Sequence, residues 1–171
     1  MIRILGAVLV IGATGTIGLT SMWRMGMRVR ILTALIAALE TMKGEICDRL
    51  TPMPELIVRL SDECDSVLYP FFGRMKAEMG KLGASSFYFI WKRAIEHSPE
   101  LELSDREKMA LIDLGRTLGR YDVEEQRSAI GHTMRRMEGF LKKAEDERRT
   151  GGKVHAVLGL IAGIFVVIML L

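Results

Sequence analysis

Cysteine and histidine are scarce in this sequence, which has two cysteines and three histidines in 171 residues. A structural zinc site needs four such ligands at close spacing, and small disulfide-rich domains are much denser in cysteine. Cys47 and Cys64 flank an expected helical turn at Thr51-Pro52. In antiparallel helices they would be about 12 Å out of register, too far for a disulfide. We therefore expect free, partly buried thiols, no metal and no cofactor.

Charge is absent from both ends of the chain. Ile4–Trp23 contains no charged residue, and His155 is the only ionisable side chain in Val154–Leu171. A membrane-spanning helix needs about 20 apolar residues. The pattern predicts an N-terminal transmembrane anchor at 1–23 and a C-terminal transmembrane segment at 154–171. A cleavable signal peptide is the alternative for the first of these.

Within the second segment, Gly159 and Gly163 form a GxxxG pair. This spacing places both glycines on one face of a helix and allows another helix to approach closely. We expect a membrane helix packing face there. His155 at the membrane boundary is interpreted as a side chain that reaches towards water, with a proton-relay role as the alternative.

The charges are concentrated in the 130 residues from Arg24 to Lys153, which hold all 21 acidic residues and 23 of the 24 basic ones. Bases cluster where this middle part meets the apolar ends, at Arg24, Arg28 and Arg30 and again before Lys153. By the positive-inside rule, the domain 24–153 is cytoplasmic. Anionic membrane lipids are the expected partners of these bases, and nucleic acid is not expected because acids and bases interleave.

The middle part is predicted to be helical throughout. From Leu32 to Ile46 the apolar residues recur every three or four positions, which indicates a helix with one buried face. Prolines mark the expected helix boundaries: Thr51-Pro52 is an expected turn, and Pro70 is expected to interrupt the chain again before a third helix. No segment has the alternation of a strand. We predict an all-α fold, an antiparallel bundle of about six helices flanked by the two membrane helices.

Several residues are assigned to helix ends. Ser104 and Glu107 have capping-box spacing, Gly119 closes the helix that they open, and Asp122 caps the longest helix. Gly115 is expected at a close helix contact. The longest helix is expected to break softly at Gly151-Gly152 before the final apolar segment.

The sequence contains no recognisable catalytic constellation. The glycines of Gly115–Gly119 follow no strand, so a phosphate-binding loop is not indicated. His97 and His132 fall on different expected helices without a nucleophile or an orienting carboxylate, and His97 is interpreted as a surface residue at a helix C-terminus. We therefore predict no enzyme. Glu40, Glu45 and Glu55, near the first helical hairpin, are taken as exposed and form a hypothetical acidic contact patch, with an ordinary solvated rim as the alternative.

These features together resemble the stage III sporulation protein AB family of small membrane proteins from endospore-forming bacteria. The resemblance covers nearly the whole chain. It is carried by the N-terminal anchor, the helix Leu35–Ile46, the Thr51-Pro52 turn with Glu55, the run Leu114-Gly115-Arg116-Thr117-Leu118-Gly119 with Asp122 and Gln126, and the apolar C-terminus. It departs at Asp48-Arg49, where the family often has Tyr-Gly.

The resemblance implies a platform or adaptor in a secretion-like channel between mother cell and forespore. It implies a middle domain similar to the cytoplasmic domain of the inner-membrane platform protein of type II secretion, in the mother-cell membrane facing the forespore. The implied partners are a secretion-type ATPase, the AA protein of the same operon, and other channel membrane proteins. Homo-oligomerisation is left open. A membrane-anchored signalling or chaperone adaptor is the alternative function.

Overall fold

The computed structural model describes the backbone of residues 2–81, 85–120 and 122–170, and the side chains of residues 23–80, 85–120 and 122–150. Every element assigned in this part of the chain is helical. The six α-helices are α1 (Ile2–Cys47), α2 (Met53–Glu63), α3 (Tyr69–Glu78), α4 (Phe87–Glu96), α5 (Asp105–Thr117) and α6 (Val123–Leu170). Short 3-10 helices cover Ser66–Leu68, Met79–Lys81 and Pro99–Leu101. The all-α prediction with six helices is confirmed.

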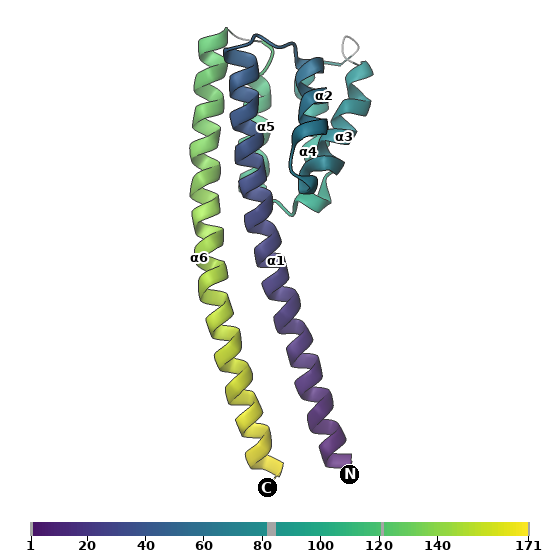
Figure 1. The fold of residues 1–171 in the computed structure, drawn as a ribbon, viewed down its shortest axis with the longest axis vertical. Coiled ribbons are helices and arrows are strands. Elements are labelled where there is room, and N and C mark those ends of the chain that lie inside the picture. Colours follow the sequence, from purple (N-terminus) through teal and green to yellow (C-terminus); the bar gives the residue numbers. More distant parts are fainter. Residues whose placement is uncertain (1, 82–84, 121, 171) are drawn as a thin grey trace. The chain divides into compact units, whose positions relative to one another are not determined.

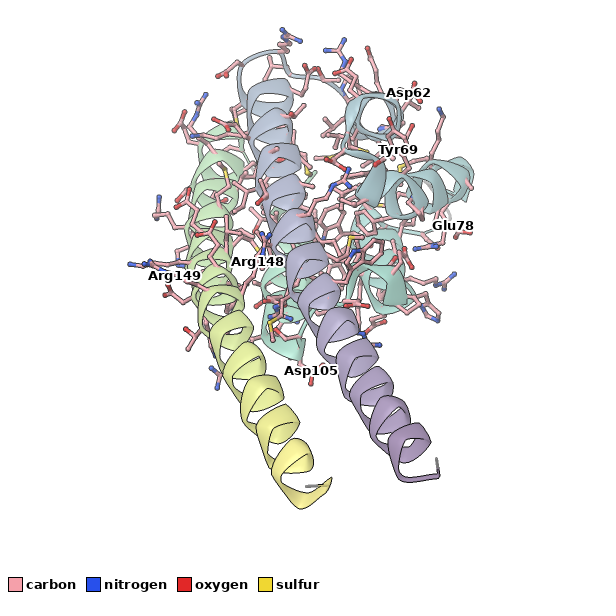
Figure 2. The ribbon with its side chains drawn as sticks, turned by 60° about the horizontal axis from the view of Figure 1, so that its bottom comes forward. Asp62, Tyr69, Glu78, Asp105, Arg148 and Arg149 are labelled. Atoms are coloured by element: carbon pink, nitrogen blue, oxygen red, sulfur yellow. The ribbon has the colours of Figure 1, made fainter. Side chains whose placement is uncertain are left out.

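The chain forms two compact units. Residues 30–142 make up the helical body, and residues 1–29 together with 143–171 make up the second unit. Within the helical body α2 packs on α3, α3 on α4 and α4 on α5, which is the arrangement seen in Figure 1. Charged side chains such as Asp62, Glu78 and Asp105 lie on the outside of the body (Figure 2).

The predicted membrane segments, 1–23 and 154–171, lie almost entirely outside the residues whose side chains are described, as do Gly159 and Gly163. The backbone of residues 2–23 and 154–170 is helical. Among the described residues, no helix is long and apolar enough to cross a membrane.

One expectation about a helix boundary is wrong. The last helix does not break at Gly151-Gly152, because α6 continues through both residues to Leu170. A glycine within a helix lowers its stability by only about 1 kcal/mol relative to alanine, and the helical residues on either side can offset this loss. Pro70 stands at the start of the third helix, as expected: it lies in the first turn of α3, where a missing N–H removes no helical hydrogen bond.

The core of the body is built from the apolar stripes that the sequence indicates. The α1 stripe is fully buried, namely Leu32, Leu35, Leu39, Met42 and Ile46. Opposite ends of α1 and α2 are tied by ion pairs: Arg30 meets Asp65, just beyond α2, at 2.9 Å, and Glu45 meets Arg59 at 2.7 Å. In the first pair the earlier residue of α1 meets the residue beyond the end of α2. In the second pair the later residue of α1 meets a residue nearer the start of α2, so α1 and α2 run antiparallel.

An aromatic cluster fills the centre of the core. Phe71 contacts Phe72 and Trp91 edge to face, with ring centroids 4.9 and 5.7 Å apart. The indole Nε1–H of Trp91 donates a buried hydrogen bond of 2.6 Å to the carbonyl oxygen of Leu111. A buried Trp is stable only when its N–H finds an acceptor. This bond fixes the ring between α4 and α5.

Candidate interaction surface

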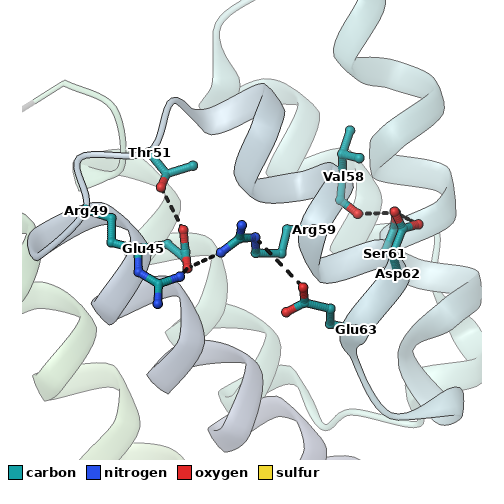
Figure 3. Close-up of polar contacts among 8 residues, drawn as sticks. All are labelled: Glu45, Arg49, Thr51, Val58, Arg59, Ser61, Asp62 and Glu63. Atoms are coloured by element: carbon teal, nitrogen blue, oxygen red, sulfur yellow. Dashed lines mark hydrogen bonds and ion pairs between the residues drawn. The ribbon is translucent and has the colours of Figure 1, made fainter.

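Glu45 is the centre of a buried polar cluster at the end of α1 (Figure 3). Its Oε1 accepts hydrogen bonds from Arg49 at 2.6 Å and from Arg59 at 2.7 Å. Its Oε2 accepts one from the Thr51 hydroxyl at 2.7 Å. The Thr51 hydrogen bond, joined by Arg59 and Arg49 and opposed by burial, holds the pKa of the Glu45 carboxyl below its usual range. The carboxylate therefore links α1, the turn and α2.

The expectation that Glu45 is an exposed contact residue is wrong. Its exposed fraction is 5 %, and both carboxylate oxygens are occupied by partners from this chain. Residue type and proximity to a turn suggested exposure, whereas the packing of α2 against α1 brings Arg59 over the carboxylate. A charge this buried needs such pairing. Glu45 is a structural residue.

Glu40 and Glu55 are both exposed. Glu40 lies about 140° around α1 from Glu45 at 100° per residue, which turns it away from the packed face. Glu55 lies in the first turn of α2. Neither forms an ion pair with another residue whose side chain is described. A role for these two residues in partner binding stays a prediction.

The turn between α1 and α2 is held by backbone as well as side-chain bonds. The N–H of Thr51 donates to the carbonyl of Glu45 at 2.9 Å, and Pro52 immediately precedes α2. Leu50 has a φ of 56°, in the left-handed region, and is 67 % exposed. A bulky side chain is strained at such a φ. No residue near Leu50 in the sequence predicts this strain.

The turn between α5 and α6 has the residues assigned to it. Gly115 is buried against Trp91, and Gly119 has a φ of 74°. The N–H of Gly119 donates to Oε1 of Gln126 at 3.1 Å. Asp122 accepts a hydrogen bond from the backbone N–H of Glu125 at 2.8 Å, which caps α6. These residues shape the turn and cap α6.

The two turns lie next to each other in the helical body. The Asp48 carboxylate meets the Arg127 guanidinium at 2.9 Å, and the Cys47 thiol lies 3.8 Å from the carbonyl oxygen of Val123. Burial raises the pKa of the Cys47 thiol. Cys47 and Cys64 are both free, as predicted. Cys47 is buried where the two turns meet.

The side chains that could bind a metal or take part in catalysis lie apart from one another in the described part of the chain. No three metal-ligating side chains come together there. His97 is exposed at the C-terminal end of α4, with Nδ1 3.0 Å from the Arg93 carbonyl oxygen, as the sequence indicated for a helix terminus. His132 lies on α6, in a groove between α5 and α6 that the sequence did not reveal.

Comparison with known proteins decides the family. Residues 3–171 match the family described as Stage III sporulation protein AB. The chain belongs to this family. Stage III sporulation protein AB of Bacillus subtilis (strain 168) is 25% identical over 172 residues, which cover 100% of both chains.

The fold agrees with that of the stage III sporulation protein AB family. A solved structure of a Stage III sporulation protein AB has a TM-score of 0.66 to this chain at 23% identity, covering 72% of this chain and 98% of that chain. At this identity the likeness supports the fold alone. The resemblance noted in the sequence is confirmed by both comparisons.

This member of the stage III sporulation protein AB family gives Asp48 and Arg49 structural roles. Asp48 pairs with Arg127 of α6, and Arg49 pairs with Glu45. The Asp48–Arg127 pair fastens the end of α1 to α6, whereas the Arg49–Glu45 pair is a local contact at the end of α1.

Proposed function

We propose that the protein is a non-enzymatic membrane platform of a sporulation-specific, secretion-like channel between mother cell and forespore, where it couples a cytoplasmic ATPase to membrane components. The observation that carries this proposal is the family match, which extends over residues 3–171. The family places the protein in sporulation, and the platform role is our own extension of that.

The arrangement of buried charge supports an adaptor rather than a catalyst. Glu45 and Glu107 are the two buried acidic residues of the described part, and each is used to hold the fold. Glu45 fastens the α1–α2 turn, and Glu107 accepts a hydrogen bond of 2.7 Å from the N–H of Ser104 in a capping box. Catalytic acids commonly have perturbed protonation in a cleft open to substrate. These two carboxylates have no such access.

α1 and α6 connect the helical body, which we propose is cytoplasmic, to the terminal segments, which we propose are membrane anchors. α1 is unbroken over 46 residues, a length of about 69 Å, and α6 is unbroken over 48 residues. Each continues from the helical body into one of the apolar terminal segments. We propose that these segments anchor the protein in the mother-cell membrane. The body is then held beside the bilayer, where a cytoplasmic ATPase can reach it.

The proposed ATPase contact uses Glu40 and Glu55, because both carboxylates are exposed and lack an ion-pair partner among the described residues. A basic surface on the ATPase is the expected counterpart. The experiment measures binding of the purified secretion-type ATPase to the full chain in a non-ionic detergent. The double charge-reversal variant Glu40→Lys/Glu55→Lys is compared with wild type and with Glu138→Lys/Glu145→Lys. This control changes the net charge by the same amount at exposed positions on α6.

We expect the ATPase to bind wild type and the control variant with similar affinity and to bind Glu40→Lys/Glu55→Lys at least tenfold more weakly. Equal affinity for all three would remove the Glu40 and Glu55 contact. Absence of any binding to wild type would remove the coupling role itself. In cells, the contact-deficient variant is expected to reduce the yield of heat-resistant spores at unchanged protein level.

A further inference from the structure

A groove of about 560 Å³ runs between α5 and α6 within the helical body. Most of its uncharged lining residues are small, and we call them the floor of the groove. They are Ala110 and Thr117 from α5 and Ser128, Ala129 and Thr133 from α6, with Leu114 as the one larger apolar residue beside them. Short side chains let the backbone of a bound segment approach closely.

The walls of this groove are charged. Arg116, His132, Arg135 and Arg136 line it, together with Asp113 and Glu125. Arg116 is already engaged, since its guanidinium lies 3.9 Å from the Asp113 carboxylate and 5.7 Å from the centre of the Tyr88 ring.

Arg135 and Arg136 differ from Arg116 in having no ion pair within the part of the chain whose side chains are described. Together with His132 they occupy positions i, i+3 and i+4 of α6, so they project from one face of the helix. This end of the groove carries two uncompensated guanidinium groups.

We infer that the α5–α6 groove binds an acidic helical segment of a partner protein. His132 and Arg136 are separated by about 6 Å along α6, so carboxylates at i and i+4 of a second helix can each meet an N–H donor there. Helices commonly bind by laying one face into a groove, and here complementary charge selects that face. Arg135 and Arg136 would meet the acidic face of the partner, and the small floor would take its short side chains.

The acidic wall residues select this ligand over others. Asp113 and Glu125 would repel the continuous negative charge of a nucleic-acid backbone or an anionic lipid surface. A polypeptide can instead place a neutral or basic residue opposite each of them. The inference does not depend on the ATPase contact at Glu40 and Glu55, which lie on α1 and α2 and do not line the groove.

The binding test uses the full chain in a zwitterionic detergent and two labelled helical peptides of equal length. The acidic probe carries Glu at i, i+4 and i+8 and Ala at every other position, so that short side chains flank the carboxylates, and the basic probe carries Lys in place of Glu. Fluorescence anisotropy then gives each affinity at 50 mM and 300 mM salt, where screening should separate surface ion pairing from apolar binding.

Two variants test the site, and a third serves as the control. Arg135→Glu/Arg136→Glu reverses the charges in the groove, and Arg148→Glu/Arg149→Glu makes the same change at an adjacent exposed pair of α6 outside it (Figure 2). Ala129→Leu fills the groove floor without changing charge. Circular dichroism establishes that each variant keeps its helical content.

The acidic probe should bind wild type and Arg148→Glu/Arg149→Glu at least tenfold more tightly than the basic probe, and high salt should weaken it. Arg135→Glu/Arg136→Glu and Ala129→Leu should each reduce its affinity about tenfold. Equal binding of the two probes would overturn the inference. So would an equal loss with both arginine pairs, because the probe would then be following general charge rather than the groove.

Photocrosslinking identifies the natural occupant. A photoreactive benzoylphenylalanine at Ser128 should crosslink, in sporulating cells, to a Glu- or Asp-rich segment of another protein, and Arg135→Glu/Arg136→Glu should abolish the product. Crosslinking only to lipid, or only to a second copy of this chain, would overturn the assignment of a partner protein.

Discussion

Gly115 lies directly against the indole ring of Trp91. A Cβ added at Gly115 would lie 2.3 Å from Cδ1 and 3.0 Å from Cγ of that ring. The ring cannot move aside easily, because Trp91 is 2 % exposed and its Nε1 is bonded to the carbonyl of Leu111. The close packing of α4 and α5 therefore requires glycine at this position.

Gly115→Ala should lower the free energy of unfolding by about 1–3 kcal/mol, the usual cost of overpacking a core. Gly73→Ala is the matched control, since it lies in α3 and a Cβ there meets nothing within 4 Å. That variant should be neutral or more stable by up to about 1 kcal/mol. Thermal denaturation followed by circular dichroism measures both, and equal stability of the two variants would contradict the packing account.

Glu45→Gln should destabilise the helical body and make its stability depend less on pH. The folded-state pKa of Glu45 is lowered by Thr51 and by Arg59 and Arg49, so the charged carboxylate stabilises the fold above the pKa of an unfolded glutamate, about 4.3. This stabilisation is lost as the pH falls through that value and below it.

The measurement compares the melting temperature of wild type and Glu45→Gln between pH 7 and pH 3.5. The gap between them should be widest near pH 7 and should close on acidification, while the exposed control Glu138→Gln keeps close to wild type throughout. A gap that stays constant, or widens, at acid pH would refute the role of the Glu45 charge.

Leu50→Gly should stabilise the protein. The left-handed φ of 56° strains leucine by about 1–2 kcal/mol, whereas glycine adopts it freely. Leu50 is also exposed, so little apolar burial is lost. Allowing for the greater flexibility of glycine in the unfolded chain, we expect a net gain of about 1 kcal/mol.

Lys142→Gly provides the contrast for this prediction, because Lys142 is an exposed residue in the interior of α6. The same glycine should there cost about 1 kcal/mol. Chemical denaturation of the two variants beside wild type gives both values, and destabilisation by Leu50→Gly would show that the turn is not strained.

The helices were predictable because they depend on local pattern. The stripe from Leu32 to Ile46 and the capping box at Ser104 and Glu107 are each defined by residues that are close together in the sequence, and the structure contains both. The continuation of α6 through Gly151-Gly152 was not predictable from the glycines themselves, since the helical residues on either side decide whether their cost is offset.

The candidate site depends on contacts between distant residues, so less of it was accessible to sequence reasoning. Glu45 was misplaced on the surface because its partner Arg59, fourteen positions further on, reaches it only through the antiparallel packing of α2. The α5–α6 groove likewise arises where Ala110 of one helix faces Ala129 and Thr133 of another. No single stretch of the sequence predicts that these residues of α5 and α6 line one groove.

The central claim, that apolar ends anchor a cytoplasmic helical body in the membrane, is tested most directly by cysteine labelling in intact cells. Cys47 and Cys64 are first replaced by Ala and Ser, and one new cysteine is placed at the exposed position Glu138. We expect a membrane-impermeant maleimide to label Glu138→Cys only after the cells are permeabilised, in protein that sediments with the membranes. Labelling of Glu138→Cys in unbroken cells, or recovery of the full chain in the supernatant after detergent-free ultracentrifugation, would contradict the account.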